Sequence, residues 1–272
     1  MVDVQITAEL KMKLKRRVGV MVTLGNTVIF AKRALIRMRK NPEQLFDAVF
    51  SPVLFTLLFA FLLGGAVAGS VSSYLPILIP GVLVMTTLTS CGTAATQIKE
   101  DMDKSSTKRF KAMPISRFAP VAGVLVADLL RFAIAGSIVF ITGFFLGFAP
   151  DAGIWSVFAS LFLVMFVGWC FSWLFAWIGM LMKSATGASM FTWLIMFPLT
   201  FLSNAFVPAE TLPMALKFFV DYINPLTKVI SAVREMLYVG TIGSDFWFAI
   251  LGSLVVLVIF VPLTLYAYNR KT

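Results

Sequence analysis

Two ionisable residues lie deep inside an apolar segment, and they are the strongest candidates for chemistry in this chain. Asp128 and Arg131 are three positions apart, so on a helix they share one face and can form an ion pair. An ionisable side chain near the bilayer centre costs roughly 2.5–3.5 kcal/mol on insertion scales. The pair therefore predicts either a structural anchor, with a side chain that reaches the membrane surface, or a role in gating or coupling. A proton relay would need more intramembrane carboxylates than the chain contains.

Residue types that support catalysis or metal binding are scarce. The chain has no histidine, which removes the commonest metal ligand and the commonest general base. Its two cysteines, Cys91 and Cys170, each lie within an apolar stretch, as expected of small core side chains rather than of a disulfide or redox pair. We find no GxxxxGK(S/T) phosphate loop and no Gly-rich dinucleotide motif. We therefore predict no catalytic residue, no metal site and no cofactor bound by this chain.

The elements that position the charge pair must be membrane helices. Residues 48–98, 152–182, 184–209 and 246–269 contain no Asp, Glu, Lys or Arg. Backbone polar groups in lipid must bond within the protein, so such segments form helices or the strands of a closed barrel. They are too long and too uniformly apolar for barrel strands, which alternate over about 10 residues. With 59% hydrophobic and 13% charged residues, against about 25% charged in soluble domains, the sequence predicts an all-α polytopic membrane protein.

We predict six transmembrane helices between residues 45 and 268. Their expected ranges are about 45–68, 74–97, 119–148, 154–182, from the Lys183-Ser184 link to about 207, and 246–268. Residues 1–44 form the predicted N-terminal segment and residues 269–272 the predicted tail. Little of the chain remains for a folded soluble domain.

The distribution of basic residues predicts the orientation of these helices. The segment to Gln44 holds ten Lys and Arg residues, residues 99–117 hold six, the link at Lys183 holds one and the tail two, whereas residues 208–245 hold three. Cytoplasmic segments collect Lys and Arg, so both termini are predicted to be cytoplasmic. The same rule accounts for the net charge of +10, so the charge does not indicate a nucleic-acid partner.

Residues 23–40 predict an amphipathic helix that lies flat among the lipid headgroups. One face is apolar and comprises Leu24, Val28, Ala31, Leu35 and Met38. Arg33, Arg37 and Lys40 lie on the opposite face, and Asn41-Pro42 ends the helix. This helix is either a passive topology anchor or an interfacial helix that also contacts a cytoplasmic partner.

Two further segments are not spans. Residues 99–117 are charged but carry Phe110 and Met113, which predict a short helix docked in a groove of another protein rather than an ordinary cytoplasmic loop. Residues 210–245 are too long for a turn. Their apolar spacing, interrupted by Asn224-Pro225 and stopped by Gly240, predicts two short helices that dip into the outer leaflet, the second of them from Ser231 to Tyr238. The alternative is a surface hairpin over the bundle.

The residues around the loop 99–117 carry a recognisable pattern. It consists of Asp101-Met102, the run Arg109-Phe110-Lys111-Ala112-Met113-Pro114-Ile115-Ser116-Arg117, Gly123, and Ala127-Asp128-Leu129-Leu130-Arg131. A second stretch has Phe201-Leu202-Ser203-Asn204-Ala205-Phe206-Val207-Pro208, Leu212-Pro213 and Asn224-Pro225-Leu226-Thr227. The pattern resembles the signature of ABC type-2 transporter permeases, and is most similar to the membrane subunit of daunorubicin-resistance-type drug exporters. The resemblance extends from the amphipathic helix to the sixth span.

This resemblance implies the membrane subunit of an ATP-binding cassette exporter, which is not itself an enzyme. A separate ATPase subunit, with ATP and Mg²⁺, would supply the hydrolysis. Two permease chains, expected as a homodimer in the plasma membrane of a bacterium or archaeon, would complete the transporter with two ATPases. The residues implied to couple to the ATPase are Asp101, Met102, Arg109, Phe110, Met113 and Pro114. The amphipathic helix would lie beside them, residues 183–186 would make a smaller contact, and residues 208–245 would form re-entrant helices that cap the path.

The chain departs from the family pattern at Ser105, Lys108 and Val124, where the family often has Gly, an acidic residue and Arg. The coupling helix should tolerate the first two changes with a different ATPase partner. The expected cargo is a lipophilic or amphipathic drug-like compound, and a lipid-linked glycan or another lipid is the alternative within exporters. An ion-coupled carrier or channel would need repeated intramembrane charges or inverted repeats, whereas the sequence shows one charge pair and no clear repeat.

Overall fold

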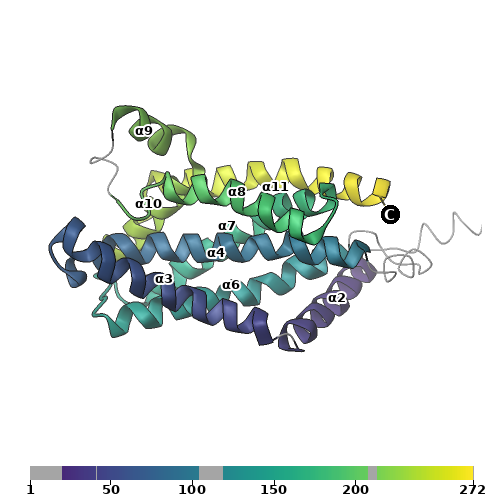
Figure 1. Ribbon diagram of the computed structural model, residues 1–272, viewed down its shortest axis with the longest axis horizontal. Coiled ribbons are helices and arrows are strands. Elements are labelled where there is room, and N and C mark those ends of the chain that lie inside the picture. Colours follow the sequence, from purple (N-terminus) through teal and green to yellow (C-terminus); the bar gives the residue numbers. More distant parts are fainter. Residues whose placement is uncertain (1–19, 41, 104–118, 208–212, 272) are drawn as a thin grey trace, which may run out of the picture.

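The computed structural model describes residues 20–40, 42–103, 119–207 and 213–271, with only the backbone described for some residues near helix ends. Over these ranges every regular element is a helix (Figure 1). The order is α2 (Val20–Lys40), α3 (Pro42–Ala68), α4 (Val71–Asp103), α6 (Ala119–Phe145), α7 (Ile154–Leu181), α8 (Ala185–Phe201), α9 (Met214–Phe218), the π-helix η2 (Phe219–Ile223), α10 (Pro225–Tyr238) and α11 (Ser244–Lys271). The predicted all-α class is confirmed.

Within the described ranges five helices are long and apolar enough to cross a membrane, namely α3 from Ala48, α4, α6, α7 and α11 as far as Tyr268. The predicted fifth span corresponds to α8, which has only 17 residues. At 1.5 Å per residue such a helix is about 26 Å long, against a hydrocarbon thickness of about 30 Å. After Phe201 the chain leaves the helix but stays buried from Ser203 to Phe206. A sixth span therefore remains a prediction. Hydropathy stays high beyond Phe201, so it does not reveal that α8 ends there.

The central helix is α4, which packs against α7, α3, α6 and α8 (Figure 1). In its most apolar window 72% of the residues are buried, against 17% in α11. Small residues allow this close packing. A Cβ added to Gly179 of α7 would lie 2.2 Å from the carbonyl oxygen of Ala95 in α4, so only glycine lets the two backbones approach this closely.

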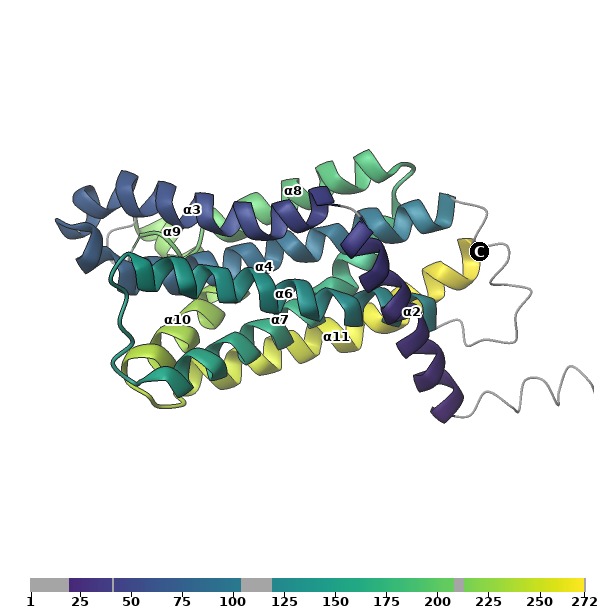
Figure 2. The same cartoon turned by 90° about the horizontal axis from the view of Figure 1, so that it is seen from below.

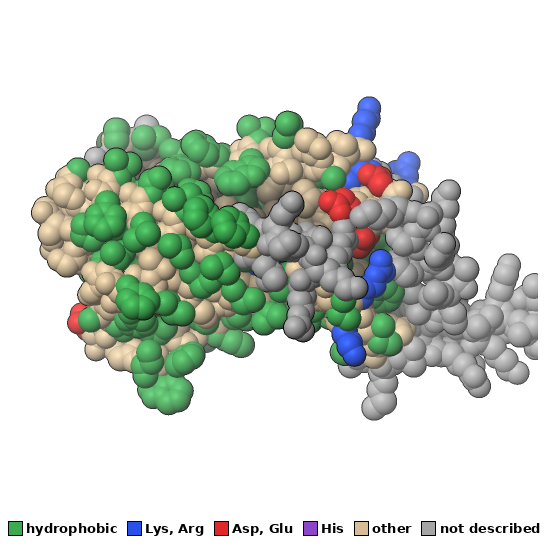
Figure 3. Space-filling view, turned by 60° about the horizontal axis from the view of Figure 1, so that its bottom comes forward, with side chains coloured by type: hydrophobic (Ala, Val, Ile, Leu, Met, Phe, Trp, Pro, Cys, Tyr) green, Lys and Arg blue, Asp and Glu red, His purple; other side chains and the backbone are tan. Residues whose placement is uncertain are grey.

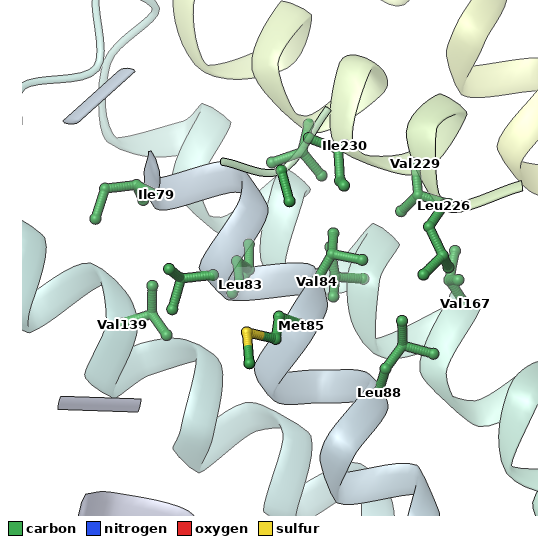
Figure 4. Close-up of a cluster of buried hydrophobic side chains, with 14 of the residues drawn as sticks. Ile79, Leu83, Val84, Met85, Leu88, Val139, Val167, Leu226, Val229 and Ile230 are labelled. Atoms are coloured by element: carbon green, nitrogen blue, oxygen red, sulfur yellow. The ribbon is translucent and has the colours of Figure 1, made fainter. Parts of the chain in front are cut away.

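Apolar side chains from four helices meet around α4 (Figure 4). In this cluster Ile79, Leu83, Val84, Met85 and Leu88 come from α4, Val139 from α6, Val167 from α7, and Leu226, Val229 and Ile230 from α10. Cys91 and Cys170 are both free and buried. The Cys91 sulfur lies 3.2 Å from the Gly168 carbonyl oxygen of α7, so it serves in helix packing.

The segment after α8 folds over one end of the bundle as α9, η2 and α10. Asn224-Pro225 interrupts it as predicted, but α10 begins at Pro225 rather than near Ser231. Asn224 is buried and caps α10 by accepting a 2.9 Å hydrogen bond from the Leu226 amide. Its Nδ2 also donates to the carbonyl oxygens of Leu199 at 2.7 Å and Leu202 at 2.6 Å. One side chain thus joins the start of α10 to the end of α8.

The two ends of the bundle differ in charge. We call the end that carries α2, the last turn of α4 and the end of α11 the charged end, and the end that carries α9 and α10 the far end (Figures 1 and 2). Figure 3 shows most Lys, Arg, Asp and Glu side chains of the face in view near the charged end, with hydrophobic side chains spread over the rest. In Figure 2, α2 crosses the charged end obliquely, and it packs mainly on α6.

Candidate functional site

The two intramembrane charges predicted from the sequence form an ion pair on α6. Arg131 Nη1 lies 2.7 Å from Asp128 Oδ1. The same Nη1 atom donates a hydrogen bond to the Thr93 hydroxyl oxygen of α4. Asp128 is 2% exposed and Arg131 is 4% exposed, so Arg131 does not extend to the membrane surface. The pair therefore joins α6 to α4 inside the bundle.

This ion pair uses only part of its bonding capacity. Asp128 Oδ2 and Arg131 Nε are buried and have no hydrogen-bond partner among the described residues. Buried polar atoms nearly always have partners, because desolvation without a hydrogen bond is costly. A buried ion pair of this kind is weak evidence for a purely stabilising role.

A polar groove lies next to the pair, between α3, α4 and α8. Its volume is about 280 Å³. We call it the hydroxyl groove, and it is lined by Ser51, Thr89, Gly92, Thr93, Thr96, Ser189, Thr192, Trp193 and Met196. Thr93 belongs both to this groove and to the contact with Arg131. The groove contains no charged side chain among its lining residues, so it can accept an uncharged polar group within an apolar bundle.

The hydroxyl groups of α4 present mainly acceptors to the groove. Thr89 donates to the carbonyl oxygen of Thr86 at 2.9 Å, Thr93 to that of Ser90 at 2.7 Å, and Thr96 to that of Thr93 at 2.9 Å. These bonds use the hydroxyl protons within α4 itself, so the oxygen lone pairs remain for a ligand. On α8, the Thr192 hydroxyl is buried without a partner in the part of the chain described. The groove therefore favours ligands with hydrogen-bond donors.

The hydroxyl groove has a sequence signal, although none of its residues is among the predicted site residues. Thr89, Thr93 and Thr96 follow the spacing i, i+4 and i+7, which places them along one side of a helix. Because threonine bonds to its own helix, it is a common residue in apolar helices and does not stand out as charged residues do.

A second pocket, at the charged end, collects three of the predicted site residues. Arg33 of α2 and Asp101 and Met102 of α4 line it together. Its other lining residues are Phe30, Ala34, Gln97, Ile98, Pro120, Val121, Val124 and Tyr268. We call it the junction pocket, because helices α2, α4, α6 and α11 meet there. Asp101 and Met102 belong to the last turn of α4, which continues into the predicted loop as far as Asp103.

The remaining predicted coupling residues are not placed. Arg109, Phe110, Met113 and Pro114 lie outside the described residues. Arg37 and Lys40 belong to α2, but only their backbone is described. These roles therefore stay predictions. Within the described ranges, no group of three or more His, Cys, Asp or Glu side chains could hold a metal ion.

The packed face of α2 differs from the predicted one. Ala31 and Met38 are buried as expected, but Val28 is 66% exposed. Phe30, which lies off the predicted stripe, packs against α6 instead. It approaches Gly123 so closely that a Cβ added there would lie 2.3 Å from the Phe30 Cβ. The glycine leaves a depression in α6 that sets the rotation of α2. The apolar stripe of α2 alone could not reveal this.

Comparisons with known proteins cover most of this chain. Residues 26–238, from α2 to the end of α10, match the family model described as ABC-2 type transporter. The chain is also 33% identical over 242 residues to the daunorubicin resistance ABC transporter permease protein DrrB1 of Streptomyces coeruleorubidus. That match covers 88% of this chain and 84% of the relative. The family match includes the ion pair, the hydroxyl groove and all but Tyr268 of the junction pocket.

Proposed function

This chain belongs to the ABC-2 type transporter family, and we propose that it is the permease subunit of an ATP-driven exporter of lipophilic or amphipathic drug-like compounds. The observation that carries the proposal is the 33% identity, over 88% of the chain, to a permease named for drug resistance. The proposal assigns ATP hydrolysis and its Mg²⁺ to a separate ATPase subunit. The chain itself contributes the path across the membrane.

The charged end is the proposed docking surface for the ATPase. On the positive-inside rule this end is cytoplasmic. Helix α4 ends and α6 begins at this end, and Phe110 with Met113, in the segment between the two helices, would sit in a groove of the ATPase. Asp101 and Met102 at the end of α4, with Arg33 of α2 beside them in the junction pocket, would flank that contact. A movement of the loop would then act directly on α4 and α6.

A second copy of the chain is the proposed partner within the membrane. Large apolar side chains of α3 and α8, two of the helices that line the hydroxyl groove, are exposed, including Phe61, Leu62, Leu194 and Phe197. A second permease packed on this face would turn the groove into an enclosed path between two chains. The residues of α9, η2 and α10 would cap that path at the far end as re-entrant helices.

The groove also supports the proposed cargo class. Its lining of hydroxyl oxygens, Trp193 and Met196 suits a molecule with an apolar body and hydrogen-bond donors. The same hydroxyl lining would suit the sugar hydroxyls of a lipid-linked glycan, so such a lipid is the second candidate. An ion-coupled carrier has weaker support, because the spans described here contain one buried ion pair.

Reconstitution tests the proposal. The chain would be co-expressed with candidate ABC ATPase subunits, purified in mild detergent and placed in proteoliposomes. We expect an ATPase subunit to co-purify, its activity to rise with amphipathic drugs, and the drug to move only when ATP is supplied. Transport by the chain alone, or stimulation by lipids and glycolipids but by no drug, would contradict the proposed partner or the proposed cargo respectively.

A further inference from the structure

The Arg131–Thr93 contact joins two helices that the proposed coupling loop also joins. Thr93 lies ten residues before the end of α4 at Asp103, and Arg131 lies twelve residues after the start of α6 at Ala119. At 1.5 Å per residue these positions are about 15 Å and 18 Å from the respective helix ends. The coupling loop and the Arg131–Thr93 contact therefore connect the same two helix segments, residues 93–103 of α4 and residues 119–131 of α6, at opposite ends.

The other contacts between these helices include many apolar ones. Ile79 and Leu83 of α4 lie against Gly143 and Gly136 of α6. Apolar packing of this kind is non-directional, so it specifies the register of α4 on α6 less strictly than a hydrogen bond does. The hydrogen bond from Arg131 to Thr93 fixes one particular register, and Thr93 also lines the hydroxyl groove.

We propose that Arg131 is a positioning residue that couples α4 to α6, so that a movement at the coupling loop carries both helices and the hydroxyl groove together only while Arg131 holds Thr93. The inference rests on the proposed function, since it assigns a coupling role within an ATP-driven exporter. It names one hydrogen bond, between a buried guanidinium and a groove hydroxyl, as the contact that decides whether α6 moves with the groove.

The unused atoms of the ion pair provide a second arrangement. A guanidinium and a carboxylate form their most directional contact through two parallel hydrogen bonds. Here the pair has one bond, through Nη1, and leaves Nε and Asp128 Oδ2 unpaired among the described residues. A rotation of the guanidinium would place its Nε edge against both carboxylate oxygens and take Nη1 away from Thr93. Arg131 can therefore keep its ion pair with Asp128 in two arrangements, one with the hydrogen bond to Thr93 and one without it.

The test compares hydroxyl losses at two groove positions. Thr93→Val keeps the side-chain shape but removes the acceptor for Arg131, and Thr93→Ser restores it. Thr96→Val is the matched control, because Thr96 also lines the groove and also donates to its own helix, to the carbonyl oxygen of Thr93. Each variant would be purified with the ATPase subunit and reconstituted, and cargo moved per ATP hydrolysed would be measured together with basal ATPase activity.

We expect Thr93→Val to lower cargo moved per ATP by about fivefold or more at saturating cargo. At the same cargo concentration Thr93→Ser and Thr96→Val should keep the wild-type ratio, although Thr96→Val removes a groove hydroxyl and should raise the cargo concentration needed for half-maximal transport. Arg131→Lys, which keeps the charge beside Asp128 but lacks the fork of donors, should behave like Thr93→Val and covers the case in which the valine variant does not assemble.

The outcomes separate the inference from the function on which it rests. Equal loss of coupling in Thr93→Val and Thr96→Val, or wild-type coupling in Thr93→Val and Arg131→Lys, would overturn the inference while leaving an active exporter. A wild-type complex that moves no cargo with ATP would overturn the proposed function and the inference with it.

Discussion

Removing Arg131 alone is expected to destabilise the chain far more than removing both members of its ion pair. In Arg131→Met, the Asp128 carboxylate stays 2% exposed and loses the partner of its Oδ1. Breaking a buried pair from one side costs about 3–5 kcal/mol, because an uncompensated charge remains. Thr93 loses a donor as well, worth about 0.6 kcal/mol in membrane helices, so the expected loss is about 4–6 kcal/mol.

The double variant Asp128→Leu/Arg131→Met removes both charges and leaves no unpaired buried charge. Replacing a buried pair with apolar residues of similar volume is often neutral or stabilising, so this variant should lie within about 1 kcal/mol of the wild type or above it. Leu130→Met, at an outward-facing position of the same helix, is the control for mutation of α6 as such. The free energy of unfolding in mixed micelles, followed by tryptophan fluorescence, provides the measurement.

Two results would refute this reasoning. If Arg131→Met is as stable as the wild type, the pair is not buried as described. If the double variant is as unstable as the single one, the loss comes from packing rather than from the orphaned charge. The double variant also separates stability from coupling, because it lacks the contact with Thr93. It should fold, bind the ATPase subunit and still move little cargo per ATP.

Three further changes test other parts of the structure. Phe110→Ala should reduce ATPase co-purification or remove cargo-stimulated ATPase activity while membrane insertion stays intact, and normal stimulated activity would count against the proposed coupling loop. Asn224→Ala removes a helix cap and two carbonyl contacts, so the free energy of unfolding should fall by about 2 kcal/mol, and an unchanged value would contradict the capping role. Gly123→Leu should displace Phe30 of α2 and weaken ATPase binding in a pull-down. Gly65→Leu, with no neighbour within 4 Å of its added Cβ, should leave ATPase binding unchanged. Equal effects of the two variants would exclude a contribution of the position of α2 to ATPase binding.

The sequence was sufficient for features that depend on local chemistry. Apolar length located α3, α4, α6, α7 and α11, because a lipid environment demands uncharged segments with internal backbone bonds. The three-residue spacing of Asp128 and Arg131 predicted a shared face, and the Asn224-Pro225 pair predicted a break, since proline lacks an amide proton and fixes φ. Each of these inferences needs only the residue and its near neighbours.

Features that depend on a partner helix were not predictable in the same way. The rotation of α2 follows from Gly123 on α6, which a helical wheel of α2 cannot contain. The early start of α10 depends on Asn224 reaching the last turn of α8. The end of α8 at Phe201 falls within an uncharged stretch, so hydropathy continues across it. Tertiary hydrogen bonds and close approach decide these details.

The position of α4 explains why the polar features of this chain lie together. It is the most buried span, yet it supplies Thr93 to both the groove and the ion pair, and Asp101 and Met102 to the junction pocket. About two turns of α4, without a proline, separate Thr93 from Asp101. Because a helix transmits rotation and translation along its length with little internal distortion, a displacement at Asp101 must appear at Thr93. Holding Thr93 with a buried cation, rather than with another apolar contact, makes that displacement depend on the position of α6.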